Sequence, residues 1–313
     1  MNKLLWIECF VRSVETGSFS LVAKEMQIGQ PNVSRHIASL EKLLGTRLLH
    51  RSTRQMLPTA DGQRYYAQAR HALDVLMEAD SDMRGQQDPH GLLRVACPES
   101  VGSDIILPAL PRFLDSYPSV DVDLCLSDEY VDLVAQGIDI AIRGGTLKDS
   151  AFRARRVGTS QRVCVASAAY LQKKGIPEQP EDLVRHECII YTLLAGGNKT
   201  WPFKQGEFNV GGRVRLNNLN GVRQAVLQDL GIAYLPSWMV AAELASGRVR
   251  TVLDTHSLGS SPVNALYPAQ KTLPKRASVF LDFLVELFSA VPGLDGVALS
   301  SRELVHSSLE ELR

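Results

Sequence analysis

The hydrophobic pattern of this 313-residue chain changes at about residue 91. Before that point, apolar residues recur at the three- and four-residue spacing of helices. After it, short apolar stretches typical of strands alternate with amphipathic helical stretches. The segment between them, residues 85–91, holds two glycines and a proline, which indicates a hinge. The sequence therefore predicts a helical front part, a hinge and a second part of a different class, a division that also suits the length.

The second part repeats strand and helix several times. The expected strands are 92–97, 120–126, 139–143, 162–166, 213–216 and 232–235, and the expected helices are 105–116, 131–136, 168–174 and 219–228. This alternation predicts an α/β fold with a largely parallel sheet. In such sheets, small ligands bind beyond the carboxyl ends of the strands and close to helix N-termini.

The net charge of zero conceals a division between the two parts. Residues 1–64 carry nine basic and five acidic side chains, and the remaining residues carry 25 basic and 29 acidic ones. A basic front part on an acidic body indicates that only the front part meets a polyanion such as DNA. A chance fluctuation of this size is the alternative, so the charge needs support from motifs.

Five cysteines, an odd number without a Cys-x-x-Cys pair, favour reduced and mostly buried thiols over disulfides or structural zinc. The seven histidines show no metal-ligand spacing, so we expect no metal and no cofactor. No apolar run reaches the roughly 18 residues of a membrane span, and we expect no membrane partner. Glu8 interrupts the first apolar stretch, so no export signal is expected and a cytoplasmic protein is predicted.

The front part begins with three helices in quick succession. A first helix over 4–14 is expected to end at Gly17, and a second over 21–27 is expected to be capped by Ser20. After a tight turn at Ile28 and Gly29, a third helix begins near Gln30, where Pro31 is tolerated in the first turn.

The third helix has two different faces. Val33, Ile37, Leu40 and Leu44 share the apolar face, and the opposite face carries residues that form hydrogen bonds. This is the pattern of a recognition helix in the major groove, where such side chains read base edges. The candidate DNA-binding residues of this helix are Gln30, Pro31, Asn32, Ser34, Arg35, His36 and Ser39.

A basic hairpin is expected directly after the third helix. Residues 48–49 and 56–57 suit two short strands, and Arg51 and Arg54 lie at the tip between them. Side chains in such a wing contact phosphates, which position the protein on DNA without reading sequence. A small helical bundle with a solvated charged face is the alternative for each of these features alone, and their order makes it less favourable.

These residues resemble the signature of the LysR-type transcriptional regulators. The resemblance is carried by Ala23-x-x-Met26, Gln30-Pro31-x-Val33-Ser34-Arg35-x-Ile37, Leu40-Glu41, Leu44-Gly45, Leu48, Arg51-x-x-Arg54 and Thr59-x-x-Gly62. Two residues depart from the family pattern. Gly29 stands where the family usually has a serine cap, and Pro58 stands where leucine usually precedes the threonine. We expect a slightly weaker helix start and a short second wing strand, with no loss of function.

A long helix over 60–84, capped by Thr59, follows the wing. Its apolar seam consists of Tyr66, Ala69, Leu73, Leu76 and Met83, and a helix of this length needs a partner for such a seam. The resemblance implies that this linker helix pairs two subunits, so that a homodimer presents two recognition helices to a two-fold-related site. It also implies a homotetramer, as a dimer of dimers. The alternative is that the seam packs on the chain's own body.

The second part resembles the effector-binding domain of the same family, which is similar to type 2 periplasmic binding proteins. The shared residues are Leu107-Pro108, Phe113, Tyr117-Pro118, Asp139-x-Ala141-x-Arg143-x-Gly145, Ala169-Tyr170-Leu171, His186-x-Cys188, Trp201, Gly231-Ile232-Ala233 and Leu235-Pro236. They fit a common branch of the family. The resemblance implies subdomain I over 92–164 and 267–290 and subdomain II over 165–266, with an effector bound between them.

Several polar residues follow the expected strands or begin the expected helices. Hydroxyl groups and helix N–H groups at such positions suit a carboxylate, and Arg143 adds a charge-assisted bond. The candidate effector-binding residues are Ser100, Gly102, Ser103, Ser127, Arg143, Tyr191, Asn218 and Asn220. We expect an organic or aromatic acid as effector. Ordinary helix caps and surface salt bridges are the alternative for each residue taken alone.

The predicted organisation has four parts. They are a winged helix-turn-helix over 1–59, a linker helix and hinge over 60–91, an effector-binding domain over 92–292 and a tail over 293–313 that receives no role. The expected partners are double-stranded promoter DNA, a small-molecule effector, a second copy of the chain and, for an activator, RNA polymerase. An enzyme is the first alternative, but no nucleophile or dinucleotide motif is present. A ligand-binding protein without DNA function is the second, and the front part disfavours both.

Overall fold

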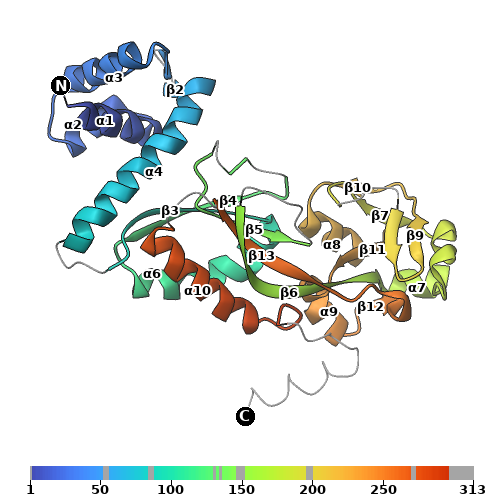
Figure 1. Ribbon diagram of the computed structural model, residues 1–313. Coiled ribbons are helices and arrows are strands. Elements are labelled where there is room, and N and C mark those ends of the chain that lie inside the picture. Colours follow the sequence, from blue (N-terminus) through green and yellow to red (C-terminus); the bar gives the residue numbers. More distant parts are fainter. Residues whose placement is uncertain are drawn as a thin grey trace. The chain divides into compact units, whose positions relative to one another are not determined.

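The structure, a computed structural model, describes residues 2–51, 56–83, 88–129, 132, 133, 136–145, 152–194, 200–268 and 273–295 (Figure 1). The chain divides into two compact units. The first is built mainly from residues 1–89, and the second from the rest of the chain except two short segments, 131–139 and 270–275, which group with the first.

The first unit contains a winged helix-turn-helix, as predicted. Its elements are α1 (Lys3–Thr16), α2 (Phe19–Glu25), α3 (Gln30–Leu44), β1 (Leu49–Arg51), β2 (Met56–Pro58) and α4 (Ala60–Met83). The strands β1 and β2 pair antiparallel and form the wing. Phe10, Val33, Leu40 and Tyr66 are almost completely buried in the shared core, so the apolar face predicted for α3 does point inward.

The ends of these helices follow the expected local rules with one exception. Gly17 and Gly45 adopt the left-handed conformation after α1 and α3, with φ of 64° and 71°. The prediction that Ser20 caps the second helix is wrong. Ser18 is the cap, its Oγ accepts a hydrogen bond from the backbone N–H of Leu21, and α2 starts two residues earlier than expected. Ser18 takes the extended backbone of a cap, and the ring of Phe19 packs against the core, so the helix begins there.

The start of α4 is fixed to the wing by two residues of the family signature. The Oγ1 of Thr59 accepts a hydrogen bond of 2.9 Å from the N–H of Gly62, which confirms the predicted cap. The same hydroxyl donates to the carbonyl oxygen of Arg47, and the N–H of Thr59 donates to the carbonyl oxygen of Leu48. At Gly62, a Cβ atom would lie 1.9 Å from that Leu48 oxygen. Only glycine allows α4 to start so close to the wing.

The apolar seam of α4 divides into two halves. Tyr66 and Ala69 are buried in the core of the first unit, so the N-terminal half packs on the chain itself, as the alternative held. Leu76 is 48 % exposed and Met83 is 87 % exposed. The C-terminal half of the seam is therefore exposed to solvent among the described residues.

The second unit is built on a nine-stranded mixed sheet. In sheet order its strands are β10 (Arg215–Leu216), β7 (Cys188–Tyr191), β11 (Ile232–Pro236), β6 (Phe152–Ser167), β13 (Ser260–Pro268), β5 (Ile140–Gly144), β3 (Gly91–Cys97) and β4 (Val120–Leu126). A further strand, β12 (Val249–Val252), pairs with β6, and β8 (Thr200–Phe203) forms a separate hairpin with β9 (Gly206–Asn209).

The sheet is parallel only towards its two ends. The pairs of β3 with β4 and β5, and of β7 with β10 and β11, are parallel as predicted. At the centre, β6 and β13 run antiparallel to each other and to their other neighbours. The expected strand over 162–166 is only the end of β6, which is 16 residues long. The prediction of a largely parallel sheet is wrong at the centre, because the long strand β6 runs through both halves of the unit and β13 pairs antiparallel with its first part.

The change of partner along β6 positions the site. Up to Gln161, β6 pairs with β13, and from Arg162 onward it pairs with β11. The residues on either side of this exchange therefore lie between the two halves of the sheet, close to the subdomain boundary expected at 164–165. Ser160 and Arg162 are two positions apart, so they lie on the same face of the strand.

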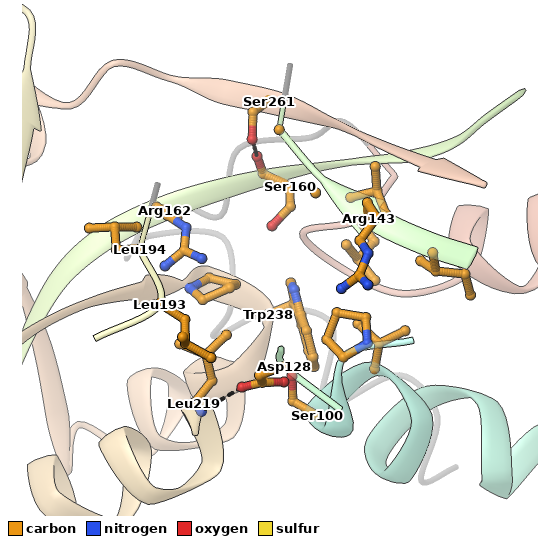
Figure 2. Close-up of a pocket in the computed structure, with 18 of the residues that line it drawn as sticks. Ser100, Asp128, Arg143, Ser160, Arg162, Leu193, Leu194, Leu219, Trp238 and Ser261 are labelled. Atoms are coloured by element: carbon orange, nitrogen blue, oxygen red, sulfur yellow. Dashed lines mark hydrogen bonds between the residues drawn. The ribbon is translucent and has the colours of Figure 1, made fainter. Parts of the chain in front are cut away.

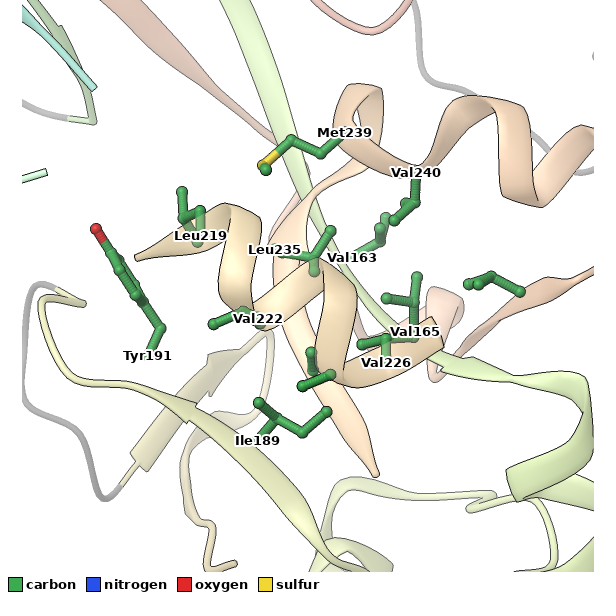
Figure 3. Packing of buried hydrophobic residues seen from close by; sticks show 13 residues of the cluster. Val163, Val165, Ile189, Tyr191, Leu219, Val222, Val226, Leu235, Met239 and Val240 are labelled. Atoms are coloured by element: carbon green, nitrogen blue, oxygen red, sulfur yellow. The ribbon is translucent and has the colours of Figure 1, made fainter. Parts of the chain in front are cut away.

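Helices cover the sheet on each half. They are α5 (Glu99–Val101), the π-helical turn η1 (Gly102–Ile106), α6 (Leu107–Ser116), α7 (Ala168–Lys174), η2 (Pro180–Arg185), α8 (Leu219–Leu227), η3 (Ser237–Val240), α9 (Ala241–Ala245), η4 (Asp254–His256) and α10 (Lys275–Ser289). In Figure 3, Val222 and Val226 of α8 pack among Val165 and Leu235 of the sheet, which holds the start of α8 beside the ends of β7 and β11. The helix expected over 131–136 lies mostly outside the described residues, as does the tail beyond Asp295.

All five cysteines are free thiols, as predicted, and Cys125 is the one that is not fully buried. Burial raises the pKa of Cys9 to about 11 and that of Cys97 and Cys188 to about 12. These thiols therefore act as small apolar core residues. Among the described residues, no helix is both long and apolar enough to cross a membrane.

Candidate functional site

The outer face of α3 carries the predicted DNA-binding side chains. Gln30, Pro31 and Arg35 are exposed, and Asn32, Ser34, His36 and Ser39 are half-buried along the same helix. The guanidinium of Arg35 donates to the Oδ1 of Asn32, so two candidate base-reading groups are held side by side. The side chain of Arg51 and the whole of Arg54 lie outside the described residues.

The N-terminus of α3 is capped by backbone alone. Gly29 has the extended conformation of a cap residue, with φ −68° and ψ 142°, and supplies no side-chain acceptor. The departure from the family pattern thus leaves the cap geometry unchanged and removes the side-chain cap, and the weaker helix start stays a prediction. Pro31 has no N–H group and the N–H of Asn32 donates to the carbonyl oxygen of Gly29, so this terminus offers a phosphate oxygen mainly the positive end of the helix.

A cavity of about 280 Å³ lies in the second unit where β6 changes partners (Figure 2). Its volume lies just below the roughly 300–1,000 Å³ that is usual for ligand pockets, so it suits a small ligand. The polar lining residues are Ser100, Asp128, Arg143, Ser160, Arg162, Tyr191 and Ser261. The remaining wall is mostly apolar and includes Ile142, Leu193, Leu194, Trp238, Val263 and Phe288. Such a lining suits a small molecule with an apolar body and one charged end.

Arg162 faces this cavity from β6. Its guanidinium lies 5.8 Å from the ring centroid of Tyr234 and 6.0 Å from that of Tyr191, and it donates a 3.2 Å hydrogen bond to the carbonyl oxygen of Tyr234. In the described part of the chain, no carboxylate forms an ion pair with it. Burial lowers the pKa of Arg162, and the charge of Asp128 opposes this effect. An anion in the cavity would relieve the cost of this buried positive charge.

Two buried serine hydroxyls line the same cavity. Ser100 is 1 % exposed and Ser160 is 9 % exposed. Within the described residues, the Oγ atoms of both have no hydrogen-bond partner. Since a buried hydroxyl without a partner costs free energy, these two groups mark positions where a ligand or a water completes the bonding.

The N-terminus of α8 is occupied by carboxylates of the chain itself. The Oδ2 of Asp128 accepts hydrogen bonds from the N–H of Leu219 at 3.1 Å and from the hydroxyl of Tyr191 at 3.3 Å. Its Oδ1 accepts a bond from the N–H of Glu99, whose carboxylate in turn accepts bonds from the side chains of Asn218 and Asn220. Burial raises the pKa of Tyr191, so its hydroxyl keeps the proton that it donates.

Three of the eight predicted effector residues line the cavity, namely Ser100, Arg143 and Tyr191. The other five lie outside its lining. Gly102 is packed against the side chain of Leu126, Ser103 lies half-buried on η1, and the Oγ of Ser127 accepts a bond from the N–H of Glu129. Asn218 caps α8, and both it and Asn220 are bonded to Glu99. The side chains of Ser127 and Asn218 therefore bond to backbone N–H groups close by in the chain, as the alternative of a local cap predicted.

Four further residues of the cavity lining were not predicted from the sequence, namely Asp128, Ser160, Arg162 and Trp238. One signal pointed to Arg162, since it is a single charge at the head of the apolar stretch 163–166. Ser160 lies two positions before Arg162 and so on the same face of the strand, and Asp128 directly follows Ser127, a predicted effector residue. No pattern pointed to Trp238, because only the folding of η3 after β11 brings it to the cavity.

Two known protein families match the chain, one over each of its two parts. The family described as "Bacterial regulatory helix-turn-helix protein, lysR family" matches residues 4–63, and "LysR substrate binding domain" matches residues 86–289. The chain is 34 % identical to the transcriptional regulator CrgA of Neisseria meningitidis over 282 residues, which cover 88 % of this chain and 94 % of CrgA. It is also 34 % identical to the regulator PtxR of Pseudomonas aeruginosa over 290 residues, or 90 % and 92 % of the two chains.

A solved structure of CrgA from Neisseria meningitidis is similar in fold, with a TM-score of 0.59 and 32 % identity over 90 % of this chain and 97 % of that one. These relatives are transcriptional regulators, so the alternatives of an enzyme and of a binding protein without DNA function are set aside. Three observations indicate a DNA-binding domain followed by a ligand-binding domain. They are the polar face of α3, the cavity in the second unit and the two family matches. The chain belongs to the LysR family of transcriptional regulators, which bind DNA through a helix-turn-helix and a small effector through the second domain.

Proposed function

We propose that this regulator recognises a two-fold-related promoter site with α3 and changes transcription when an organic or aromatic acid occupies the cavity. The observation that supports DNA reading best is the polar face of α3, which opposes the buried Val33, Ile37 and Leu40. In the acid proposal, Ser100 and Arg143 remain ligand contacts in the cavity wall and Arg162 joins them. The regulator is proposed to bind its promoter in the cytoplasm, where the DNA is located.

The DNA contacts fall into two classes with different measurable effects. Ser34 and Arg35 lie on the recognition helix, where hydrogen bonds to base edges distinguish sequences. Arg51 and Arg54 belong to the wing sequence, and contacts there add affinity without specificity. Gln30, Pro31, Asn32, His36 and Ser39 complete the proposed interface.

Replacing Arg35 by alanine is expected to reduce the preference for the operator over random DNA by about 1–3 kcal/mol, because one base-edge contact is lost. Replacing Arg51 or Arg54 is expected to weaken binding to all sequences and to lower the salt slope by about one each. The measurement is a footprinting titration on the DNA upstream of the regulator's own gene, at two salt concentrations. Equal loss of affinity on operator and random DNA in the Arg35 variant would contradict base reading.

The family forms oligomers, and we propose that this chain forms a homodimer through α4. The exposed C-terminal half of the seam supports this proposal, since Leu76 and Met83 present large apolar side chains to solvent. Two such helices packed against each other would bury these residues and place two copies of α3 for a two-fold site. A dimer of dimers, and contact with RNA polymerase by an activator, extend the same proposal.

Replacing Leu76 by aspartate is expected to shift the full-length protein to monomer, because a charge cannot be buried in a helix pair without a partner. Light scattering after size exclusion measures the mass. Replacing Asp80, an exposed residue of the same helix, by alanine is the control and should leave the mass unchanged. A Leu76 variant that keeps its oligomeric mass would place the interface elsewhere.

The proposed switch is a shift between two populated states. An effector changes transcription only if it binds the state with one arrangement of DNA-binding heads better than the other. We also propose the division into 1–59, 60–91, 92–292 and a tail of unassigned role. The cavity belongs to the third of these parts.

A further inference from the structure

Besides Arg143, whose guanidinium donates to the carbonyl oxygen of Glu129, the cavity contains two places that suit an anion, and they differ in occupancy. One is the N-terminus of α8, where the helix dipole and free N–H groups attract negative charge. The other is the guanidinium of Arg162. In this chain the first place already holds the carboxylate of Asp128, bonded to the N–H of Leu219 and supported by Glu99 beneath it.

The second place has no such internal partner. Among the described residues, the ion pairs of the second unit involve other arginines, and none involves Arg162. The rings of Tyr191 and Tyr234 orient the guanidinium, and one of its NH groups is used by the Tyr234 carbonyl. The remaining edge of the fork is left for an acceptor with two oxygen atoms, as in a carboxylate.

The hydroxyl of Ser160 lies on the same face of β6 as Arg162, and the hydroxyl of Ser100 faces the cavity from α5. Both are buried and lack a partner within the described chain. Figure 2 shows Ser160 and Arg162 on one strand, with Trp238 and Ser100 on the side of the cavity opposite that strand. A carboxylate at Arg162 can accept from Ser160, and a polar group on the ligand body can reach Ser100.

We infer that Arg162, with Ser160, anchors the carboxylate of the effector, while the chain's own Asp128 excludes that carboxylate from the N-terminus of α8. This inference rests on the proposed function, because it names the ligand class of the same cavity. The effector is a small acid with one carboxylate and an apolar body, which packs against Trp238, Leu193, Leu194 and Val263. A second negative charge near Asp128 would be repelled, so dicarboxylates are disfavoured.

The test uses the full-length protein and matched pairs of acid and amide. The pairs are acetate and acetamide, butyrate and butyramide, and benzoate and benzamide, with succinate, inorganic phosphate and sulfate as further arms. Trp238 lines the cavity, so its fluorescence reports binding, and a Trp238→Phe variant identifies its share of the signal. At least one monocarboxylate is expected to bind at least tenfold more tightly than its amide, because the amide lacks the charge that pairs with the guanidinium.

The variants are then titrated with the carboxylate that binds most tightly. Arg162→Met is expected to weaken binding about 100-fold and Arg162→Lys about tenfold, since lysine keeps the charge and loses the planar fork. Ser160→Ala is expected to weaken it several-fold, and it removes an Oγ atom on which folding does not depend. Arg250→Met, at an exposed arginine of β12 outside the cavity lining, is the matched control and should bind like the unmodified protein. Thermal unfolding shows that each variant is folded.

Three results would overturn the inference. One is equal affinity for acids and amides, a second is unchanged carboxylate affinity in both Arg162→Lys and Ser160→Ala, and a third is no saturable binding of any monocarboxylate up to tens of millimolar. Tighter binding of phosphate, sulfate or succinate would also overturn it, because the anchor would then suit a different anion. Operator footprinting of the same variants without ligand tests the proposed function separately, since it does not require Arg162.

Discussion

Replacing Gly62 by alanine is expected to unfold the DNA-binding unit and to abolish operator binding. The added Cβ would lie 1.9 Å from the carbonyl oxygen and 2.8 Å from the carbonyl carbon of Leu48. Both atoms belong to the backbone, so no side-chain rotation relieves the clash. The wing and α4 cannot simply separate, because the N–H of Thr59 donates to that same Leu48 oxygen. We expect a loss of about 3 kcal/mol or more in the free energy of unfolding.

The matched control for this substitution is Gly45→Ala. Gly45 has a positive φ of 71° and no atom within 4 Å of the added Cβ, so alanine there adds backbone strain alone, worth about 1–2 kcal/mol. Far-UV circular dichroism during heating measures both variants in the full-length protein, and footprinting measures operator binding. If the Gly62 variant melts at the same temperature as the Gly45 variant, the close approach of α4 to the wing does not limit stability.

Replacing Asp128 by alanine is expected to have the largest effect in the second unit. Its carboxylate accepts three hydrogen bonds, from the N–H of Glu99, the N–H of Leu219 and the hydroxyl of Tyr191. Alanine leaves these three donors without their acceptor and removes the negative charge from the helix end. Hydrogen bonds to charged groups contribute about 1.5–3 kcal/mol each, and water can replace part of that loss. We expect a loss of about 3 kcal/mol in the free energy of unfolding.

Two further variants test whether the charge of Asp128 or its hydrogen bonds stabilise the unit. Asp128→Asn keeps one acceptor oxygen, which in the Oδ2 position serves the N–H of Leu219 and the hydroxyl of Tyr191, and it loses the charge, so an intermediate loss is expected. Asp121→Ala, at an exposed aspartate on β4, removes a carboxylate without these bonds and should change stability little. Differential scanning calorimetry of the full-length protein measures all three. Equal transition temperatures for the Ala variants at 121 and 128 would show that the three bonds do not stabilise the unit.

The Asp128→Ala variant is also expected to change which ligands the cavity accepts. In the inference above, Asp128 also keeps the effector's carboxylate away from the N-terminus of α8. Removing it opens a second anion place beside the first, so the Asp128→Ala protein is expected to accept a dicarboxylate such as succinate that the unmodified protein rejects. Tryptophan fluorescence titration measures this gain, and unchanged rejection of succinate would contradict the role of Asp128 in selecting the ligand.

The DNA-binding unit was predictable from the sequence because its signals are local. The glycines at 17 and 45 end helices by their own backbone freedom, and Thr59 caps the helix that it precedes. The apolar spacing of α3 leaves only one face for DNA. The exception was the second helix, for which Ser20 was predicted as the cap, whereas the packing of Phe19 against the core makes Ser18 the cap.

The second unit was predictable in its class and much less so in its site. Strand and helix alternation predicted α/β, and several elements have nearly the expected ends, as α7 over Ala168–Lys174 shows. The long antiparallel strands β6 and β13 were missed, because the pairing partners lie about 100 residues apart and no local pattern encodes them. For the same reason, the exchange of partners at Arg162 was not visible in the sequence.

The sequence by itself determined where α1 and α3 end, where α4 starts, which face of α3 is polar and which family the chain resembles. These features depend on neighbouring residues and on backbone preferences that act over one or two turns. Only the tertiary structure decided which polar residues meet in the cavity. It bonded Asn218 and Asn220 to Glu99 and left Arg162 without an acidic partner among the described residues. A hydrogen bond between distant segments depends on the packing of whole strands and helices, which no short stretch of sequence specifies.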